Sequence, residues 1–181
     1  MGFHHTAVAT RDLQATHKFY SEAMGFALVK VIANPTEGGG WAKHAFYEIT
    51  KDEYIAFWDL HDDSIGDKWS PALSTGMGLP IWVNHIAFRA QDLADLDARR
   101  RRWNDHGLLV HEIDHGWCRS IYTVDPNGIL VEFCTTTHVM TAADKEEALQ
   151  LLMNPQPALD TTPLKIIVHQ PTGQPALAKA S

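Results

Sequence analysis

The same succession of hydrophobic and polar patterns occurs twice in the sequence, once along residues 5–60 and again along residues 85–136. Each half begins with a short run in which apolar and polar residues alternate. Apolar residues then recur every three or four positions, and three runs rich in β-branched and aromatic residues follow. Alternation is typical of a half-buried strand, and the longer period is typical of an amphipathic helix. Each half is therefore predicted to fold as β-α-β-β-β.

The two alternating runs share their sequence as well as their pattern. "HTAVATRDL" begins at His5 and "HIAFRAQDL" begins at His85, so the histidine, the alanine two residues later and the Asp-Leu pair repeat with an offset of 80 residues. Asp12 and Asp92 are placed to cap the two following helices, and a glycine ends each helical pattern. An internal repeat of this kind predicts two equivalent modules.

The predicted organisation has four parts. They are a first module over residues 1–60, a connecting loop over 61–80, a second module over 81–137, and a C-terminal helix and extended arm over 138–181. The connector is rich in Gly, Pro, Ser and Asp, which are typical of loops.

The C-terminal part is expected to form a helix over residues 141–153 and then a proline-spaced arm. Within this arm, "LKIIVH" (Leu164–His169) is apolar and strand-like. It is predicted to pack against the sheet of its own or of a neighbouring subunit. The closing "TGQPALAKAS" is typical of a flexible or partner-bound segment.

Composition narrows the class of protein. Hydrophobic residues make up 45% and charged residues 20% of 181 residues, and the formal net charge is −7. The basic run Arg99–Arg102 lies in an acidic, helix-like stretch, so a solvated helix face is expected rather than a nucleic-acid site. The apolar runs are too short for a membrane span and no leader is evident, so we expect a cytoplasmic protein. Cys118 and Cys134 are expected to be buried, reduced thiols.

Candidate chemistry begins with the repeated histidines. In a strand, alternate side chains share a face, so His5 and His85 each share a face with small alanines that leave space in front of the ring. If the modules pair their sheets, the two histidines converge. Glu132 lies in the apolar "GILVEFC", where a carboxylate is costly unless a positive charge answers it. Two histidines and one carboxylate form the facial triad of non-haem Fe(II) sites, and zinc also uses such sets. His4 is a rival to His5, but only His5 has a counterpart 80 residues later.

With these residues in view, the chain resembles the vicinal oxygen chelate superfamily, which includes glyoxalases, bleomycin resistance proteins and type I extradiol dioxygenases. The resemblance covers about residues 3–137 and is carried by "HHTAVATRDL", "FYSEAMGF", "NHIAFRAQDL" and "YTVDPNGILVEF". It implies an α+β fold in which two paired βαβββ modules form a cupped, barrel-like mixed sheet around a metal. It also implies that His5, His85 and Glu132 are the metal ligands.

The resemblance further suggests which residues act beside the metal. Glyoxalase-like members have a fourth glutamate ligand, but aligning "YIAFWD" with "LVEFCT" places Ala56 opposite Glu132, which leaves open sites for a chelating substrate and O2. Extradiol enzymes have a substrate-binding tyrosine ten residues before the last ligand, and Tyr122 has that spacing here. A packed strand tyrosine is the alternative interpretation. His115 is either an acid or base near the metal or a solvated loop histidine.

The predicted function is an extradiol-type dioxygenase in which Fe(II), or alternatively Mn(II) or Zn(II), binds a catechol-like aromatic diol together with O2. A homodimer is expected. The sequence departs from the extradiol pattern at one position. Extradiol enzymes have a further catalytic histidine about fifteen residues before the second ligand, and this chain has Ser70 there, with His61 as a possible substitute. Two other functions stay open: a glyoxalase-like lyase or isomerase that stabilises an enediolate with a divalent metal, and a metal-free small-molecule-binding resistance module. Aromatic side chains that could serve as pocket walls or as plain core are Phe46, Phe57, Trp58 and Trp82.

Overall fold

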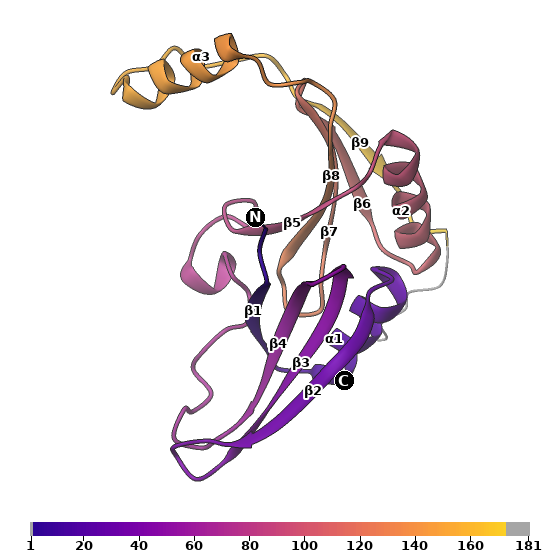
Figure 1. The fold of residues 1–181 in the computed structure, drawn as a ribbon, viewed down its shortest axis with the longest axis vertical. Coiled ribbons are helices and arrows are strands. Elements are labelled where there is room, and N and C mark those ends of the chain that lie inside the picture. Colours follow the sequence, from indigo (N-terminus) through magenta and orange to yellow (C-terminus); the bar gives the residue numbers. More distant parts are fainter. Residues whose placement is uncertain (1, 173–181) are drawn as a thin grey trace.

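The computed structural model describes residues 2–172, which form two successive βαβββ modules (Figure 1). The first module contains β1 (His5–Thr10), α1 (Leu13–Lys18), the π-helical turn η1 (Phe19–Ala23), β2 (Ala27–Pro35), β3 (Trp41–Thr50) and β4 (Glu53–His61). A loop with the short helical turn η2 (Thr75–Met77) leads to β5 (His85–Arg89), α2 (Leu93–Asp105), β6 (Val110–Asp114), β7 (Cys118–Val124) and β8 (Leu130–Thr136). The elements α3 (Ala142–Met153) and β9 (Lys165–His169) follow. The predicted α+β fold with a repeated βαβββ unit is confirmed.

Each module builds its own sheet. The first sheet has the strand order β1-β4-β3-β2, and the second has the order β5-β8-β7-β6-β9. Strands β1 and β5, which carry the repeated histidines, are the equivalent edge strands of two separate sheets, and each pairs in parallel with the last strand of its module. Within residues 2–172 of one chain, the two sheets are therefore not joined through β1 and β5, and no closed barrel forms.

The internal repeat extends to the register of the strands. His5 lies opposite Tyr54 on β4, and His85 lies opposite Leu130 on β8. Two residues further along, Ala7 is opposite Ala56 and Ala87 is opposite Glu132. The alignment that makes Ala56 the counterpart of Glu132 is therefore borne out by the strand pairing.

Both helices begin as the sequence predicts. The side chain of Asp12 accepts a hydrogen bond from the amide of Ala15, and that of Asp92 accepts one from the amide of Asp95, each at 2.8 Å. These carboxylates satisfy amide groups that have no partner within the helix. The first helical segment differs from the prediction in one respect, because α1 widens into the π-helical turn η1 before the chain turns away.

One hydrophobic core joins the two modules. Residues from α1, η1, β4, β5, α2 and β8 meet in it, and its largest fully buried members include Tyr20, Phe57, Trp103 and Phe133. Cys118 is buried and Cys134 is half-buried, and both are free thiols. Since the core contains side chains from both halves of the repeat, the modules pack as one body.

Buried polar groups also cross between the modules. The hydroxyl of Tyr20 donates to a carboxylate oxygen of Asp125 at 3.1 Å, and the hydroxyl of Thr10 donates to the amide oxygen of Asn127 at 2.7 Å. Burial raises the pKa of the Tyr20 phenol well above its usual value and raises the pKa of Asp125. Asp125 also accepts hydrogen bonds from the amides of Asn127 and Ile129, which closes the predicted "DPNG" turn.

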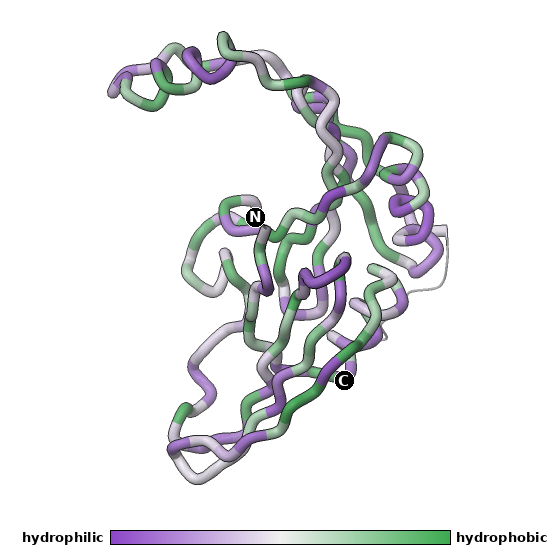
Figure 2. Tube along the Cα trace, in the orientation of Figure 1, coloured by the Kyte–Doolittle hydropathy of each residue, from purple (hydrophilic) through white to green (hydrophobic). Residues whose placement is uncertain are grey.

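The C-terminal elements differ in how they attach. The predicted helix is present as α3, which begins with a capping box at Thr141, but it has no buried residue and extends away from both sheets (Figure 1). The predicted strand is present as β9, which pairs antiparallel with β6 of the same chain. Figure 2 shows that β9 is strongly apolar, whereas α3 alternates between hydrophobic and hydrophilic residues. The "TGQPALAKAS" segment lies, from residue 173 on, outside the described residues.

Within residues 2–172, no helix combines the length and apolar character needed to cross a bilayer.

Candidate functional site

The alternation of side chains separates a core face from an open face on each sheet. On β8, Val131 and Phe133 point into the core, whereas Glu132 lies on the opposite face. On β4, Ile55 and Phe57 are buried in the core in the same way, and the residues between and beside them face the other side. The open face of each sheet is called its cup below.

His85 and Glu132 meet in the second cup. The Nε2 atom of His85 lies 3.1 Å from a carboxylate oxygen of Glu132, and the Glu132 side chain is only 7% exposed. The Nδ1 atom of His85 lies 3.1 Å from the carbonyl oxygen of Trp82, which orients the ring. If Nδ1 donates to that carbonyl in the neutral imidazole, the lone pair of Nε2 faces the carboxylate. Two electron-rich atoms so placed need a shared cation or proton, so this pair fits a metal ion.

Tyr122 and His115 form a second pair beside the first. Tyr122 on β7 lies opposite Glu132 on β8, and its hydroxyl is 3.0 Å from Nε2 of His115 in the loop between β6 and β7. Burial raises the pKa of the Tyr122 phenol, and the nearby Glu132 charge raises it further. The phenol therefore stays protonated at neutral pH and can act as a hydrogen-bond donor. Of the five predicted site residues, the structure brings together His85, Glu132, Tyr122 and His115.

His111 is a fifth polar group in this cup, and it was not among the residues predicted from the sequence. It lies on β6 directly opposite Tyr122, so that Glu132, Tyr122 and His111 form a row across three adjacent strands. The alternation in "VHEID" places His111 on one face of a strand, but only the pairing of β6 with β7 shows that this face is the one that carries Tyr122.

A cavity of about 550 Å³ opens over these residues. His85, His111, His115 and Tyr122 provide its polar lining, and its apolar lining consists of Trp82, Ile113, Leu130, Leu164 and Ile166. Of the four aromatic residues expected as possible walls, only Trp82 belongs to this cavity. A mostly apolar pocket with a few convergent polar groups is typical of a small-molecule site.

His5 lies in the first cup rather than in this one. Its ring is next to those of His4, His44 and Phe46, and the Nδ1 atoms of His4 and His5 are 2.7 Å apart. His44 is buried and stacks on Trp58 with ring centroids 3.8 Å apart, and burial lowers its pKa. Within residues 2–172 of one chain, no three His, Cys, Asp or Glu side chains gather closely enough to hold a metal.

The first cup differs from expectation at Ala56. This residue is 0% exposed and lies opposite Phe46 on β3, so within the described residues of one chain the position that corresponds to Glu132 is covered by its neighbours. His61, considered as a substitute catalytic histidine, stacks on Trp41 and pairs with Asp59 at 2.9 Å. It does not line the cavity of the second cup.

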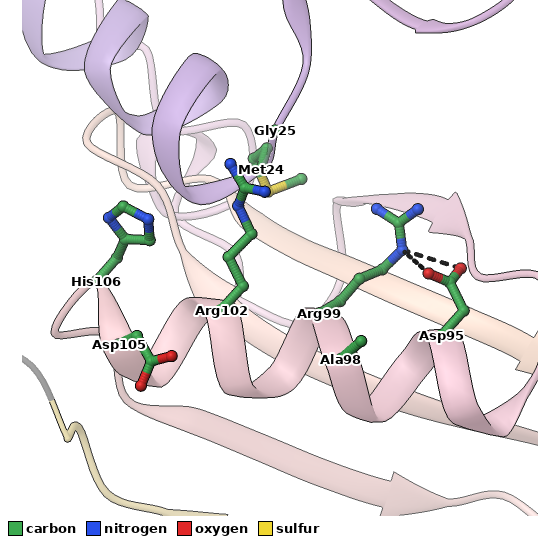
Figure 3. A pocket seen from close by; sticks show the side chains of 8 residues that line it. All are labelled: Met24, Gly25, Asp95, Ala98, Arg99, Arg102, Asp105 and His106. Atoms are coloured by element: carbon green, nitrogen blue, oxygen red, sulfur yellow. Dashed lines mark hydrogen bonds and ion pairs between the residues drawn. The ribbon is translucent and has the colours of Figure 1, made fainter.

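A second groove, also about 550 Å³, lies between the end of the first helical segment and α2 (Figure 3). Its charged groups are already paired: Arg99 binds Asp95, and Nε of Arg102 donates to the backbone carbonyl of Glu22 at 2.8 Å. Arg100 and Arg101 both pair with Asp97. The basic run is therefore a helix face with its own acidic partners, and this groove has none of the predicted site residues.

The sequence matches a family model over residues 2–133, most of the chain. The model is described as the Glyoxalase/Bleomycin resistance protein/Dioxygenase superfamily. The chain belongs to this superfamily. The resemblance inferred from the sequence is thereby confirmed. A comparison with curated proteins found no match.

Solved structures of the superfamily share this fold at low identity. A glyoxylase/bleomycin resistance protein/dioxygenase domain from Frankia sp. EAN1pec has a TM-score of 0.56 and 16% identity over 75% of this chain and 98% of that chain. TnmS3, an antibiotic binding protein from Streptomyces sp. CB03234, has a TM-score of 0.51 and 17% identity over 76% of this chain and 97% of that chain. A lactoylglutathione lyase from Agrobacterium tumefaciens has a TM-score of 0.50 and 21% identity over 74% of this chain and 92% of that chain. At these identities the likeness establishes the fold and leaves the reaction open.

Proposed function

We propose that this protein is a metal-dependent enzyme that binds both oxygens of a vicinal diol, of the extradiol dioxygenase type with a catechol-like substrate. The observation that carries the proposal is the pairing of His85 with the buried Glu132, next to the hydrogen-bonded Tyr122 and His115. Fe(II) is the proposed metal, with Mn(II) and Zn(II) as alternatives, because histidine and carboxylate ligands suit all three ions.

The proposed metal ligands are His85 and Glu132 from one subunit and His5 from a second. His5 lies on the edge strand β1, and β5 is the equivalent edge of the other sheet, so each edge is available to another copy of the chain. A two-fold dimer that joins β1 of one subunit to β5 of its partner would create two identical sites. When bound, the metal would act as a Lewis acid toward the diol and as a template that holds it beside O2.

The chain's own residues would bind and orient the substrate. The Tyr122 hydroxyl, kept protonated by burial and by Glu132, would donate a hydrogen bond to one diol oxygen. His115, in contact with that hydroxyl, could accept a proton from the diol through it or return one later. The apolar lining of the cavity would hold the ring and exclude water.

A second candidate is a lyase or isomerase that stabilises an enediolate. The same Tyr122–His115 pair favours it, because such reactions need a positioned acid and base. One solved relative is a lactoylglutathione lyase and another is an antibiotic binding protein, so both enediolate chemistry and metal-free binding are outcomes that the experiment must separate.

The test combines metal analysis with oxygen uptake. Protein purified without oxygen and loaded with Fe(II), Mn(II) or Zn(II) is expected to hold one metal per chain and, with Fe(II), to consume O2 when catechols are added. Metal binding without oxygen uptake, but with turnover of an α-hydroxycarbonyl compound, would favour the enediolate enzyme. A protein that retains no metal and still binds small aromatic compounds would be a binding module.

Mixing two inactive variants tests the shared site. In a two-fold dimer of His5→Ala with His85→Ala, one site carries both substitutions and the other carries neither. Random exchange of subunits should therefore restore about one quarter of the wild-type metal sites, because half of the dimers are mixed. A site built within one chain would show no restoration after mixing.

A further inference from the structure

The strand β9 supplies the second sheet with a wall that the first sheet does not have. Its residues lie beyond the region 2–133 that matches the family model, and the first sheet ends at its fourth strand. Ile166 of β9 lies opposite Ile113 of β6, and both line the cavity together with Leu164. The additional strand therefore widens the second cup on the side away from His85 and Glu132.

We propose that Leu164 and Ile166 determine substrate specificity by holding a bulky apolar group next to the two chelating oxygens. This inference rests on the proposed function for the identity of the chelating group, but the apolar wall itself does not depend on it. The substrate class is accordingly a vicinal diol on an aromatic ring that carries a large apolar substituent, rather than an unsubstituted or charged diol.

The lining of the cavity combines polar and aliphatic side chains, as this substrate requires. Ile113 of β6, Ile166 of β9 and Leu164 just before β9 form an aliphatic side of the cavity, which also contains His111 of β6. His85 and Tyr122 lie on other strands, and Leu130 and Trp82 lie beside His85. Leu164 is 56% exposed and Ile166 is 54% exposed, so both have apolar surface left to cover. About 550 Å³ is more than one diol-bearing ring fills, and it is within the range of about 300–1,000 Å³ for drug-sized ligands.

The wall is fixed in place rather than mobile. On the opposite face of β9, Nε2 of His169 lies 2.8 Å from a carboxylate oxygen of Glu112, and the His169 carbonyl accepts from the Asn104 amide at 3.2 Å. The Thr172 hydroxyl donates to Asp105 at 2.7 Å. These contacts anchor the strand to β6 and α2, so the backbone that carries Ile166 is positioned before a ligand binds.

The alternation of β9 also provides a matched control. Ile166 faces the cavity, whereas Ile167 faces the other side, opposite Glu112, and the two residues are almost equally exposed at 54% and 53%. Replacing either isoleucine with alanine removes the same side-chain atoms and lowers the local β-strand propensity by the same amount. Only the change at position 166 alters the wall.

The experiment measures binding without turnover. Calorimetry under anaerobic conditions on the Fe(II)-loaded full chain compares catechol with 4-tert-butylcatechol. The wild type is expected to bind the substituted catechol about ten-fold more tightly or better, because several additional carbons are buried. Ile166→Ala, alone and with Leu164→Ala, should reduce this preference several-fold, because it weakens binding of the substituted catechol more than binding of catechol. Ile167→Ala should keep the wild-type preference.

A second probe separates this inference from the proposed function. Binding of 8-anilinonaphthalene-1-sulfonate, followed by fluorescence, requires an apolar wall and no diol. Loss of its binding in Ile166→Ala but not in Ile167→Ala would support the wall even if neither catechol binds, and the proposed function alone would then fail. Equal effects of the two variants on both probes would overturn the wall. Dissociation of a dimer in Ile166→Ala would also overturn it, since a second subunit would then cover this surface.

Discussion

The two modules have the same fold and strand register but very different cups. On the core side, both present apolar residues at equivalent positions, such as Phe57 on β4 and Phe133 on β8. On the cup side, the equivalent rows read Ala7, Ala56, Phe46 and Lys30 in the first module and Ala87, Glu132, Tyr122 and His111 in the second. The repeat preserves what the fold requires, and the departure from it marks where the chemistry is.

The largest expected effect comes from removing His85, which pairs with Glu132 in the second cup, whereas its counterpart His5 lies in the first cup. His85→Ala should abolish stoichiometric metal binding, because Glu132 and the partner's His5 would be the two remaining ligands of the proposed site, which are too few to retain the ion. The fold should persist, since His85 lies on a partly exposed edge strand outside the core. Metal content by elemental analysis is the measurement, and His61→Ala is the control because His61 lies outside the cavity. One metal per chain in His85→Ala would refute the ligand assignment.

Giving the first cup a glutamate at the position of Glu132 is expected to destabilise the protein rather than create a metal ligand. Ala56→Glu introduces a carboxylate at a fully buried position opposite Phe46, and the cationic residue of that row, Lys30, lies one strand beyond Phe46. Such an unpaired buried charge should lower the free energy of unfolding by about 3–5 kcal/mol. Urea unfolding checks the loss, and Ala56→Gln separates the cost of size from that of charge. A folded, stable variant that retains metal against a chelator would instead mean that a partner's ligands reach this position.

Making the second cup resemble the first should have a smaller effect. Tyr122→Phe gives β7 the residue that β3 has at the equivalent position, Phe46, and it removes the hydroxyl bound to His115. Turnover of the best catechol should fall by the equivalent of about 1–3 kcal/mol in transition-state stabilisation, with metal content unchanged. Tyr54→Phe, a change of the same type in the first module, is the control. Equal kinetics in Tyr122→Phe and the wild type would make Tyr122 a structural residue.

Much of this arrangement follows from local sequence patterns. Alternation around His85 and Glu132 places each on a cup face, and the 80-residue repeat predicts the modules and both helix caps. These features depend on neighbours along the chain or on one strand pairing. His111 was missed because its role depends on the register between β6 and β7, which a single histidine in a strand does not reveal.

The position of His5 shows what local patterns cannot supply. Convergence of His5 with His85 requires two edge strands to meet, and whether they meet within a chain or between chains is decided by how the modules pack. The shared core turns the modules so that the sheets remain separate, and no alternation in the sequence encodes that angle. The burial of Ala56 under its neighbours is likewise a result of tertiary packing.

The smallest expected effect tests the part of the comparison in which the modules are alike. Asp12→Ala and Asp92→Ala each remove one side-chain cap with the same 2.8 Å hydrogen bond to the third residue of the following helix. Each should lower the free energy of unfolding by about 1 kcal/mol, and the two losses should add within a few tenths, because the caps share no contact partner. Asp→Asn at each position, which retains an oxygen acceptor, should recover most of the loss. If the two caps differ by far more than their shared geometry allows, the two helix starts are not equivalent in their contribution to stability.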